Sequence, residues 1–227
     1  MSAPSPTPTP LQIGLVLFPK VTQLDFTGPL QVFSSLPGAK VHLIWKRIEP
    51  VTSDSVLVLT PTTTFADCPQ LDVICVPGGL GTDDMINDEE MLAFLRQQAP
   101  GAKYITSVCT GSLVLGAAGL LEGKRATGNW LQLDPLREYG ADPVGGRFVE
   151  DGKVITAAGV TAGIDMAIHL VAREVGPEIA QAVQLGIEYD PDPPFDSGSP
   201  EKAPAEIVEL VRSFAAANDQ MPVSTGD

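Results

Sequence analysis

Hydrophobic positions along the chain fall into two kinds of run, one continuous and one with helical spacing. The continuous runs predict buried strands, because helices cover both faces of a parallel sheet. We also expect an extended, hairpin-like excursion over 56–65, rich in β-branched residues, and a hairpin over 147–156 around an Asp-Gly turn. The predicted strands span residues 11–18, 40–46, 71–79 and 104–108, and a short one ends near Asn129 and Trp130.

Apolar residues at helical spacing predict the helices. One is expected to start near Thr27 with Pro29 in its first turn, and another to carry Asp165 in its first turn and end near Val175. Others are predicted after Cys109 and over 88–98, 178–188 and 204–217. This alternation predicts one doubly wound α/β sandwich with a mostly parallel sheet over 11–217. A disordered Pro-rich tail over 1–10 would precede it, and a frayed C-terminus over 218–227 would follow.

Composition narrows the classes of partner. The 227 residues include 14 basic and 28 acidic side chains, a net charge of −14 that argues against nucleic acid or an anionic membrane as partner. The three cysteines, Cys68, Cys75 and Cys109, form neither a disulfide framework nor a zinc pattern, and their odd number favours a reducing, cytoplasmic location. The N-terminus lacks the pattern of a signal peptide. We expect neither a metal ion nor another cofactor.

The junction at Cys109 is the strongest candidate for chemistry. A sharp turn from strand to helix would lift this side chain out of the sheet and place it over the first free N–H groups of the helix. Gly111 would let the backbone turn closely. Those N–H groups favour a thiolate, so the sequence predicts a lowered pKa for Cys109. The alternative is a small, buried, unreactive residue, which is the role expected of Cys75.

Other candidates follow the first and third predicted strands. Asp25 is predicted in the loop after the first strand, where ligands of open α/β sheets bind, although an acid stabilised by a helix dipole is the simpler alternative. Gly78 and Gly79 could aim backbone N–H groups at a ligand or could form a plain turn. His42 and His169 are expected to be structural.

The motifs at 24–29, 77–79 and 107–112 together resemble the DJ-1/PfpI superfamily and, within it, the bacterial isocyanide (isonitrile) hydratases. The likeness extends from about Leu11 to Ala205. It implies a flavodoxin-like fold and a homodimer. It also implies that Cys109 is the nucleophile, that Asp25 is its acidic partner, and that Thr110 lies near the thiol.

The implied reaction converts a small-molecule isocyanide and water into an N-substituted formamide. Asp25 would protonate the terminal carbon while Cys109 attacks it, giving a thioimidate that water hydrolyses. The two groups are expected to titrate as a pair that shares one proton. The N–H groups of Thr110 and Gly79 could support negative charge.

The substrate pocket is predicted to include Asn129, Trp130 and Val160. At Asn129 the chain departs from the hydratases, which tend to carry a histidine there.

Two other functions stay open. A cysteine beside an acid also suits a glyoxalase-like enzyme that acts on carbonyl compounds. A non-catalytic redox sensor or chaperone, with Cys109 oxidised to a sulfinic acid, is the other. Proteolysis is not expected, because Thr110 stands where related peptidases carry a histidine.

Overall fold

The computed structural model describes residues 10–219, whose contacts form two units that meet between Glu188 and Tyr189. The single domain predicted over 11–217 contains this boundary, and each unit is described by itself below. The second unit contains helix α7 (Ala205–Asp219), where a helix over 204–217 was expected. Apart from Pro10 and the last two residues of α7, the predicted tail and the predicted frayed C-terminus lie outside the described residues.

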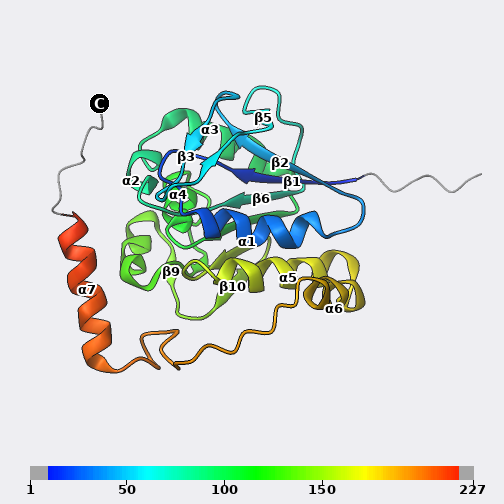
Figure 1. The fold of residues 1–227 in the computed structure, drawn as a ribbon. Coiled ribbons are helices and arrows are strands. Elements are labelled where there is room, and N and C mark those ends of the chain that lie inside the picture. Colours follow the sequence, from blue (N-terminus) through cyan, green and yellow to red (C-terminus); the bar gives the residue numbers. More distant parts are fainter. Residues whose placement is uncertain (1–9, 220–227) are drawn as a thin grey trace, which may run out of the picture. The chain divides into compact units, whose positions relative to one another are not determined.

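The first unit is built on a seven-stranded sheet in the order β10-β11-β7-β6-β1-β2-β5 (Figure 1). Every neighbouring pair is parallel except β10 and β11, which form the predicted hairpin. The doubly wound, mostly parallel α/β fold is thereby confirmed. The strands are β1 (Leu11–Val16), β2 (Ala39–Trp45), β5 (Thr63–Thr64), β6 (Val73–Val76), β7 (Tyr104–Val108), β10 (Phe148–Asp151) and β11 (Val154–Ala157).

Two small strand pairs lie outside this sheet. β3 (Val51–Thr52) pairs antiparallel with β4 (Val58–Leu59), so the expected excursion over 56–65 supplies β4 here and β5 to the main sheet. β8 (Arg125–Ala126) pairs with β9 (Asp142–Pro143). The strand expected to end near Asn129 stops at Ala126 instead. Three 3-10 helices complete the unit: η1 (Ala99–Gly101), η2 (Trp130–Gln132) and η3 (Asp134–Tyr139).

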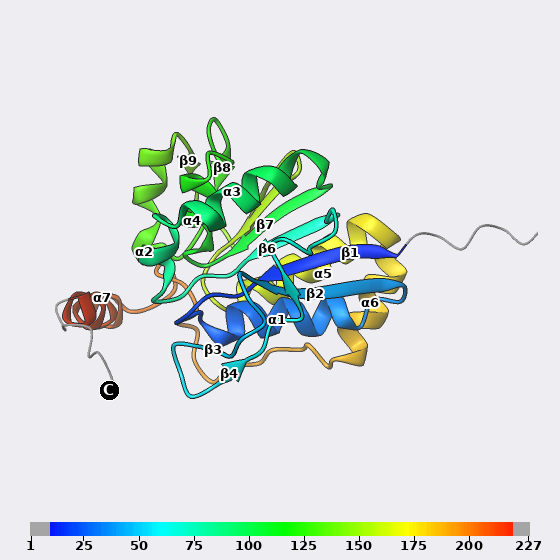
Figure 2. The same cartoon turned by 90° about the horizontal axis from the view of Figure 1, so that it is seen from above.

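The helices cover both faces of the sheet. Connections between parallel strands are right-handed, so two connections that run in opposite directions across the sheet place their helices on opposite faces. Here the chain passes from β1 to β2 in one direction and from β6 to β7 in the other. Figure 2 accordingly shows α1 on one side of the sheet and α3 and α4 on the other. The helices are α1 (Gln23–Ser34), α2 (Thr82–Met85), α3 (Glu89–Gln98), α4 (Gly111–Ala117), α5 (Ala162–Val175) and α6 (Pro177–Gly186).

Helix α1 starts earlier than predicted, and this corrects the position of Asp25. The helix begins at Gln23, so Asp25 lies in its first turn rather than in a loop, and Pro29 lies inside the helix. A proline here removes the N–H that would pair with the Asp25 carbonyl one turn earlier. Tertiary packing offsets this loss, because the Pro29 ring fits against α5, where a Cβ on Gly163 would lie 3.0 Å from it.

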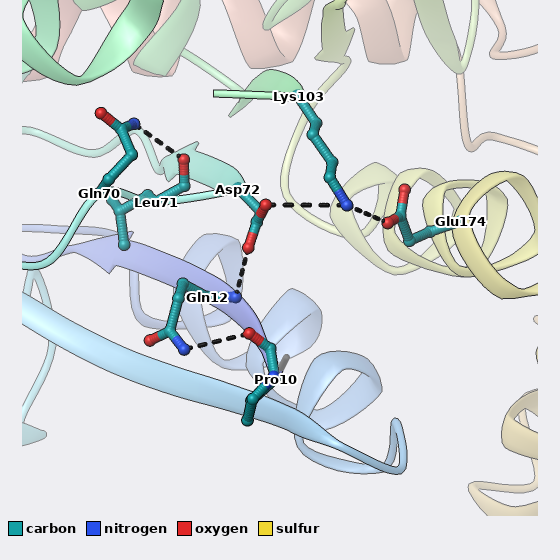
Figure 3. A network of polar contacts seen from close by, with 7 residues as sticks. All are labelled: Pro10, Gln12, Gln70, Leu71, Asp72, Lys103 and Glu174. Atoms are coloured by element: carbon teal, nitrogen blue, oxygen red, sulfur yellow. Dashed lines mark hydrogen bonds and ion pairs between the residues drawn. The ribbon is translucent and has the colours of Figure 1, made fainter. Parts of the chain in front are cut away.

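Polar residues join the strands at their amino ends (Figure 3). Asp72, just before β6, accepts a hydrogen bond of 2.8 Å from the Gln12 N–H of β1. Lys103, just before β7, lies 3.7 Å from the same carboxylate and donates to Glu174 of α5 at 2.6 Å. Three strands and a helix are therefore tied together at the end of the sheet opposite Cys109.

Both histidines are structural, as predicted. The ring of His42 in β2 is buried between Gln12, at 2.8 Å, and Thr63, at 3.2 Å. His169 in α5 lies 2.9 Å from Glu150 and packs against Phe148. Within residues 10–219, every helix is too short or too polar to cross a membrane.

Candidate functional site

The site lies at the carboxyl ends of β1, β6 and β7, where the direction of winding switches. Asp25 follows β1, Gly78 follows β6 and Cys109 follows β7. The Gly78 N–H donates a hydrogen bond of 2.9 Å to Asp25 Oδ2. A Cβ on Gly78 would lie 2.4 Å from Thr110 Oγ1 and 3.0 Å from the same Oδ2, so only glycine lets these side chains meet.

Cys109 occupies the predicted elbow between β7 and α4. Its φ of 59° lies in the left-handed region, which a non-glycine residue adopts only under constraint. Gly111 makes the turn possible, since a Cβ there would lie 2.1 Å from the carbonyl oxygen of Val76. The Cys109 side chain is 5% exposed. A strained backbone that buries a thiol at the carboxyl end of an inner strand is the arrangement expected of a nucleophile.

Three hydrogen-bond donors point at the Cys109 sulfur. The Asn129 side-chain amide donates to Sγ at 3.4 Å, and the backbone N–H groups of Val160 and Thr110 also donate to it. The Asn129 oxygen accepts from Leu131 N–H at 2.9 Å, which turns the NH₂ end toward the sulfur. Val160 has a φ of 29°, so its backbone is also constrained. Asn129 and Val160, predicted to line a pocket, thus contact the sulfur of Cys109.

Trp130 begins η2 directly after Asn129 and is partly exposed. Its place in a substrate pocket stays a prediction.

Asp25 is the buried acid of the site. Its side chain is fully buried, and Oδ1 has no hydrogen-bond partner among the described residues. Burial raises the pKa of Asp25 to about 7, although the Gly78 N–H stabilises the carboxylate. Asp25 can therefore both accept and release a proton near neutral pH, and Oδ1 is the atom left open for it.

The lowered pKa predicted for Cys109 is wrong. Burial, and after it the charge of Asp25, raises the pKa of Cys109 to about 11, and this outweighs the three donors. The helix N-terminus can be read from the sequence, whereas the depth of the turn and the nearby carboxylate of Asp25 are set by the fold. Between pH values of about 7 and 11 the pair therefore holds one proton.

Thr110 is held by two neighbours. Its Oγ1 accepts the Gly79 N–H at 3.0 Å and lies 2.7 Å from the hydroxyl of Thr82. Gly79 therefore supports the site through Thr110. Thr82 was missed at the sequence level, and the only signal was its position three residues after the Gly78-Gly79 pair, whose turn folds the following chain back on the site.

The residues of the site differ in how deeply they are buried. Cys109 and Asp25 are buried, whereas Thr110, Asn129 and Val160 are partly exposed. Within residues 10–219, no three His, Cys, Asp or Glu side chains lie close enough to hold a metal ion. The groups on hand suit attack by sulfur combined with proton transfer by a carboxyl group.

Comparisons with known proteins agree with this geometry. A model of the DJ-1/PfpI family matches residues 12–173. A curated protein of Pseudomonas putida named isonitrile hydratase is 59% identical over 206 residues, which cover 91% of this chain and 90% of that protein. An HTH-type transcriptional regulator, GbdR, of Pseudomonas aeruginosa is 30% identical over 190 residues, 80% of this chain but only 51% of that protein.

A solved structure extends the likeness to the fold. The crystal structure of a THiJ/PfpI family protein from Pseudomonas syringae matches with a TM-score of 0.90 and 43% identity. The match covers 95% of this chain and 93% of that one.

Proposed function

Because this chain belongs to the DJ-1/PfpI family, and because the buried carboxyl group of Asp25 interacts with the buried thiol of Cys109, we propose that it is an isocyanide hydratase. The observation that carries the proposal is this single acid, which is fully buried, has a pKa raised by burial to about 7, and interacts with the Cys109 thiol. An isocyanide carbon needs a nucleophile and a proton at the same atom. The Cys109 and Asp25 pair holds one of each.

In the first half of the proposed reaction, Asp25 takes the proton of the Cys109 thiol as the sulfur attacks the terminal carbon of the isocyanide. Asp25 then gives that proton to the same carbon. A C–S bond and a C–H bond form, and the product is a thioimidate joined to Cys109. The donors from Asn129, Val160 and Thr110 stabilise the developing thiolate before the attack.

In the second half, water adds to the thioimidate carbon. Asp25 takes a proton from the water molecule as the water oxygen bonds to the thioimidate carbon. Asp25 then passes that proton to the substrate nitrogen. The C–S bond then breaks, the C=O bond of the formamide forms, and the hydroxyl proton returns to Cys109 through Asp25. The two halves add one water to the isocyanide and restore the enzyme, so the reaction needs no external oxidant or reductant.

The test is turnover by the unmodified protein. We expect it to convert an alkyl and an aryl isocyanide into the matching N-formamides, followed by proton NMR, and to leave the isomeric nitriles unchanged. The nitriles are the matched control, because they carry the same substituent on carbon, whereas the isocyanides carry it on nitrogen. No formamide from any isocyanide, together with consumption of methylglyoxal, would replace this proposal with the glyoxalase-like one.

The pH dependence follows from the shared proton. We expect kcat/KM to rise as pH increases through about 7, where Asp25 becomes able to accept the thiol proton, and to fall through about 11, where Cys109 has lost it. A plateau between the two limbs is the signature of a one-proton pair. Activity that climbs steadily to pH 11 would instead indicate that a free thiolate is the active form.

Two expectations from the sequence accompany the proposal. The homodimer rests on the family resemblance, and the cytoplasmic location rests on the odd number of cysteines. Both stay predictions.

A further inference from the structure

The hydroxyl groups of Thr82 and Thr110 share a hydrogen bond whose direction can be worked out from their other partners. A hydroxyl group has one proton to donate and two lone pairs to accept with. Thr110 Oγ1 already accepts the Gly79 N–H at 3.0 Å, and its other hydrogen-bond neighbour among the described residues is Thr82 Oγ1 at 2.7 Å. Either hydroxyl could be the donor on distance alone, so the choice depends on what else each can bond to.

The surroundings of Thr82 decide the choice. Its side chain is 3% exposed, and Thr110 is the only hydrogen-bond partner of its hydroxyl among the described residues. If Thr110 donated, the Thr82 proton would be buried without an acceptor, which costs about 1–3 kcal/mol. If Thr82 donates, its proton is satisfied and both lone pairs of Thr110 are used. The second arrangement is therefore the stable one.

We propose that Thr82 is a positioning residue that, by donating to Thr110, directs the Thr110 hydroxyl proton to the reacting side of the site. With both lone pairs occupied, the Thr110 proton must point away from Thr82 and Gly79, toward the side on which Thr110 is exposed. This inference deepens the proposed function and rests on it for the acceptor, which is the substrate nitrogen. In the thioimidate that nitrogen carries a lone pair, and it gains a proton when water adds.

Backbone contacts fix the position of Thr82. Its N–H donates to the Gly79 carbonyl at 3.0 Å, and its own carbonyl accepts from Ile86 at 3.0 Å. The preceding Gly81 is pressed against Pro19, whose carbonyl oxygen would lie 2.0 Å from a Cβ at that position. The short helix α2 is thus fixed at its first residue, which places the Thr82 side chain beside Thr110.

A neutron structure of the perdeuterated protein tests the direction of the bond without any assay. We expect the deuterium between the two oxygen atoms to be bonded to Thr82, and that of Thr110 to point toward the site. A deuterium bonded to Thr110 and directed at Thr82 would overturn the inference. This readout decides the inference even if the protein turns over no isocyanide, an outcome that would refute only the proposed function.

Substitutions test the consequence for catalysis. Thr82→Val keeps the shape and removes the donor, and we expect about a tenfold loss in kcat with little change in KM, whereas Thr82→Ser keeps most of the activity. Thr106→Val is the matched control, because Thr106 is also a buried threonine but donates to the carbonyl of Ile74 within the sheet.

The double variant separates positioning from structure. If Thr82 acts through Thr110, Thr82→Val has no further effect on kcat once Thr110→Val is present. Equal losses in kcat from Thr82→Val in both backgrounds would overturn the inference, and so would a Thr82→Ser variant as slow as Thr82→Val.

Discussion

Cys109→Ala is expected to abolish formamide formation, with a loss in kcat of at least about 10⁴. The sulfur supplies the bond that makes the isocyanide carbon electrophilic toward water, and no other side chain of the site can replace it. Because alanine fills most of the space of the small cysteine side chain, the free energy of unfolding should change by only about 1 kcal/mol. Initial rates from NMR and a urea unfolding curve measure the two effects.

Cys68→Ala is the matched control for this variant. Cys68 is a half-buried free cysteine whose pKa burial raises to about 11, the same value as that of Cys109, but it lies outside the site. Its substitution should leave kcat unchanged. Turnover that survives Cys109→Ala would show that the proposed nucleophile is wrong, whatever the product.

Asp25→Asn is expected to lower kcat by about 10³ and, at pH 8, to stabilise the fold. Asparagine keeps the shape and can still accept the Gly78 N–H, but it cannot carry the proton between sulfur and carbon. The folded-state pKa of Asp25 is raised from 3.8 to about 7, so the stability that the neutral acid provides is present below pH 3.8 and is lost as pH rises through about 7. At about 1.4 kcal/mol per pH unit, the charged carboxylate costs the folded protein about 4 kcal/mol at pH 8.

Urea unfolding at pH 5 and pH 8 measures the part of this cost that arises above pH 5, about 3 kcal/mol. The unmodified protein should lose more stability than Asp25→Asn between the two pH values, because only the former ionises a buried acid. Asp83→Asn is the control, since it makes the same change of charge at an exposed position. Equal pH dependence in the unmodified protein and in Asp25→Asn would contradict a raised pKa for Asp25.

The parts of the fold that depend on local pattern could be predicted from the sequence. The apolar run before Cys109 and the glycine after it determine the elbow, because a strand, a turn and a helix each leave a short-range signal. At Asp25, prediction from local sequence signals fails. The proline at position 29 suggested a helix start, but α1 tolerates it inside because the ring packs on α5, a contact far away in the sequence.

The chemistry of the site was harder to predict than its location. The residues that meet at Cys109 come from separate segments, and Asn129, Val160 and Asp25 act on its pKa only through distances that the fold creates. A helix N-terminus favours a thiolate, yet burial of the turn reverses the result. Thr82 carries no motif, and its role depends on a count of donors and acceptors that needs coordinates.

The polar network of Gln12, Asp72, Lys103 and Glu174 has a consequence for how such a protein can change over time. It joins β1, β6, β7 and α5 at the end of the sheet farthest from the thiol, and none of its contacts involves the segments that carry Asn129 and Val160. Substitutions at Asn129 or Val160 therefore leave this network in place. One architecture can in this way be inherited by descendants with different substrates.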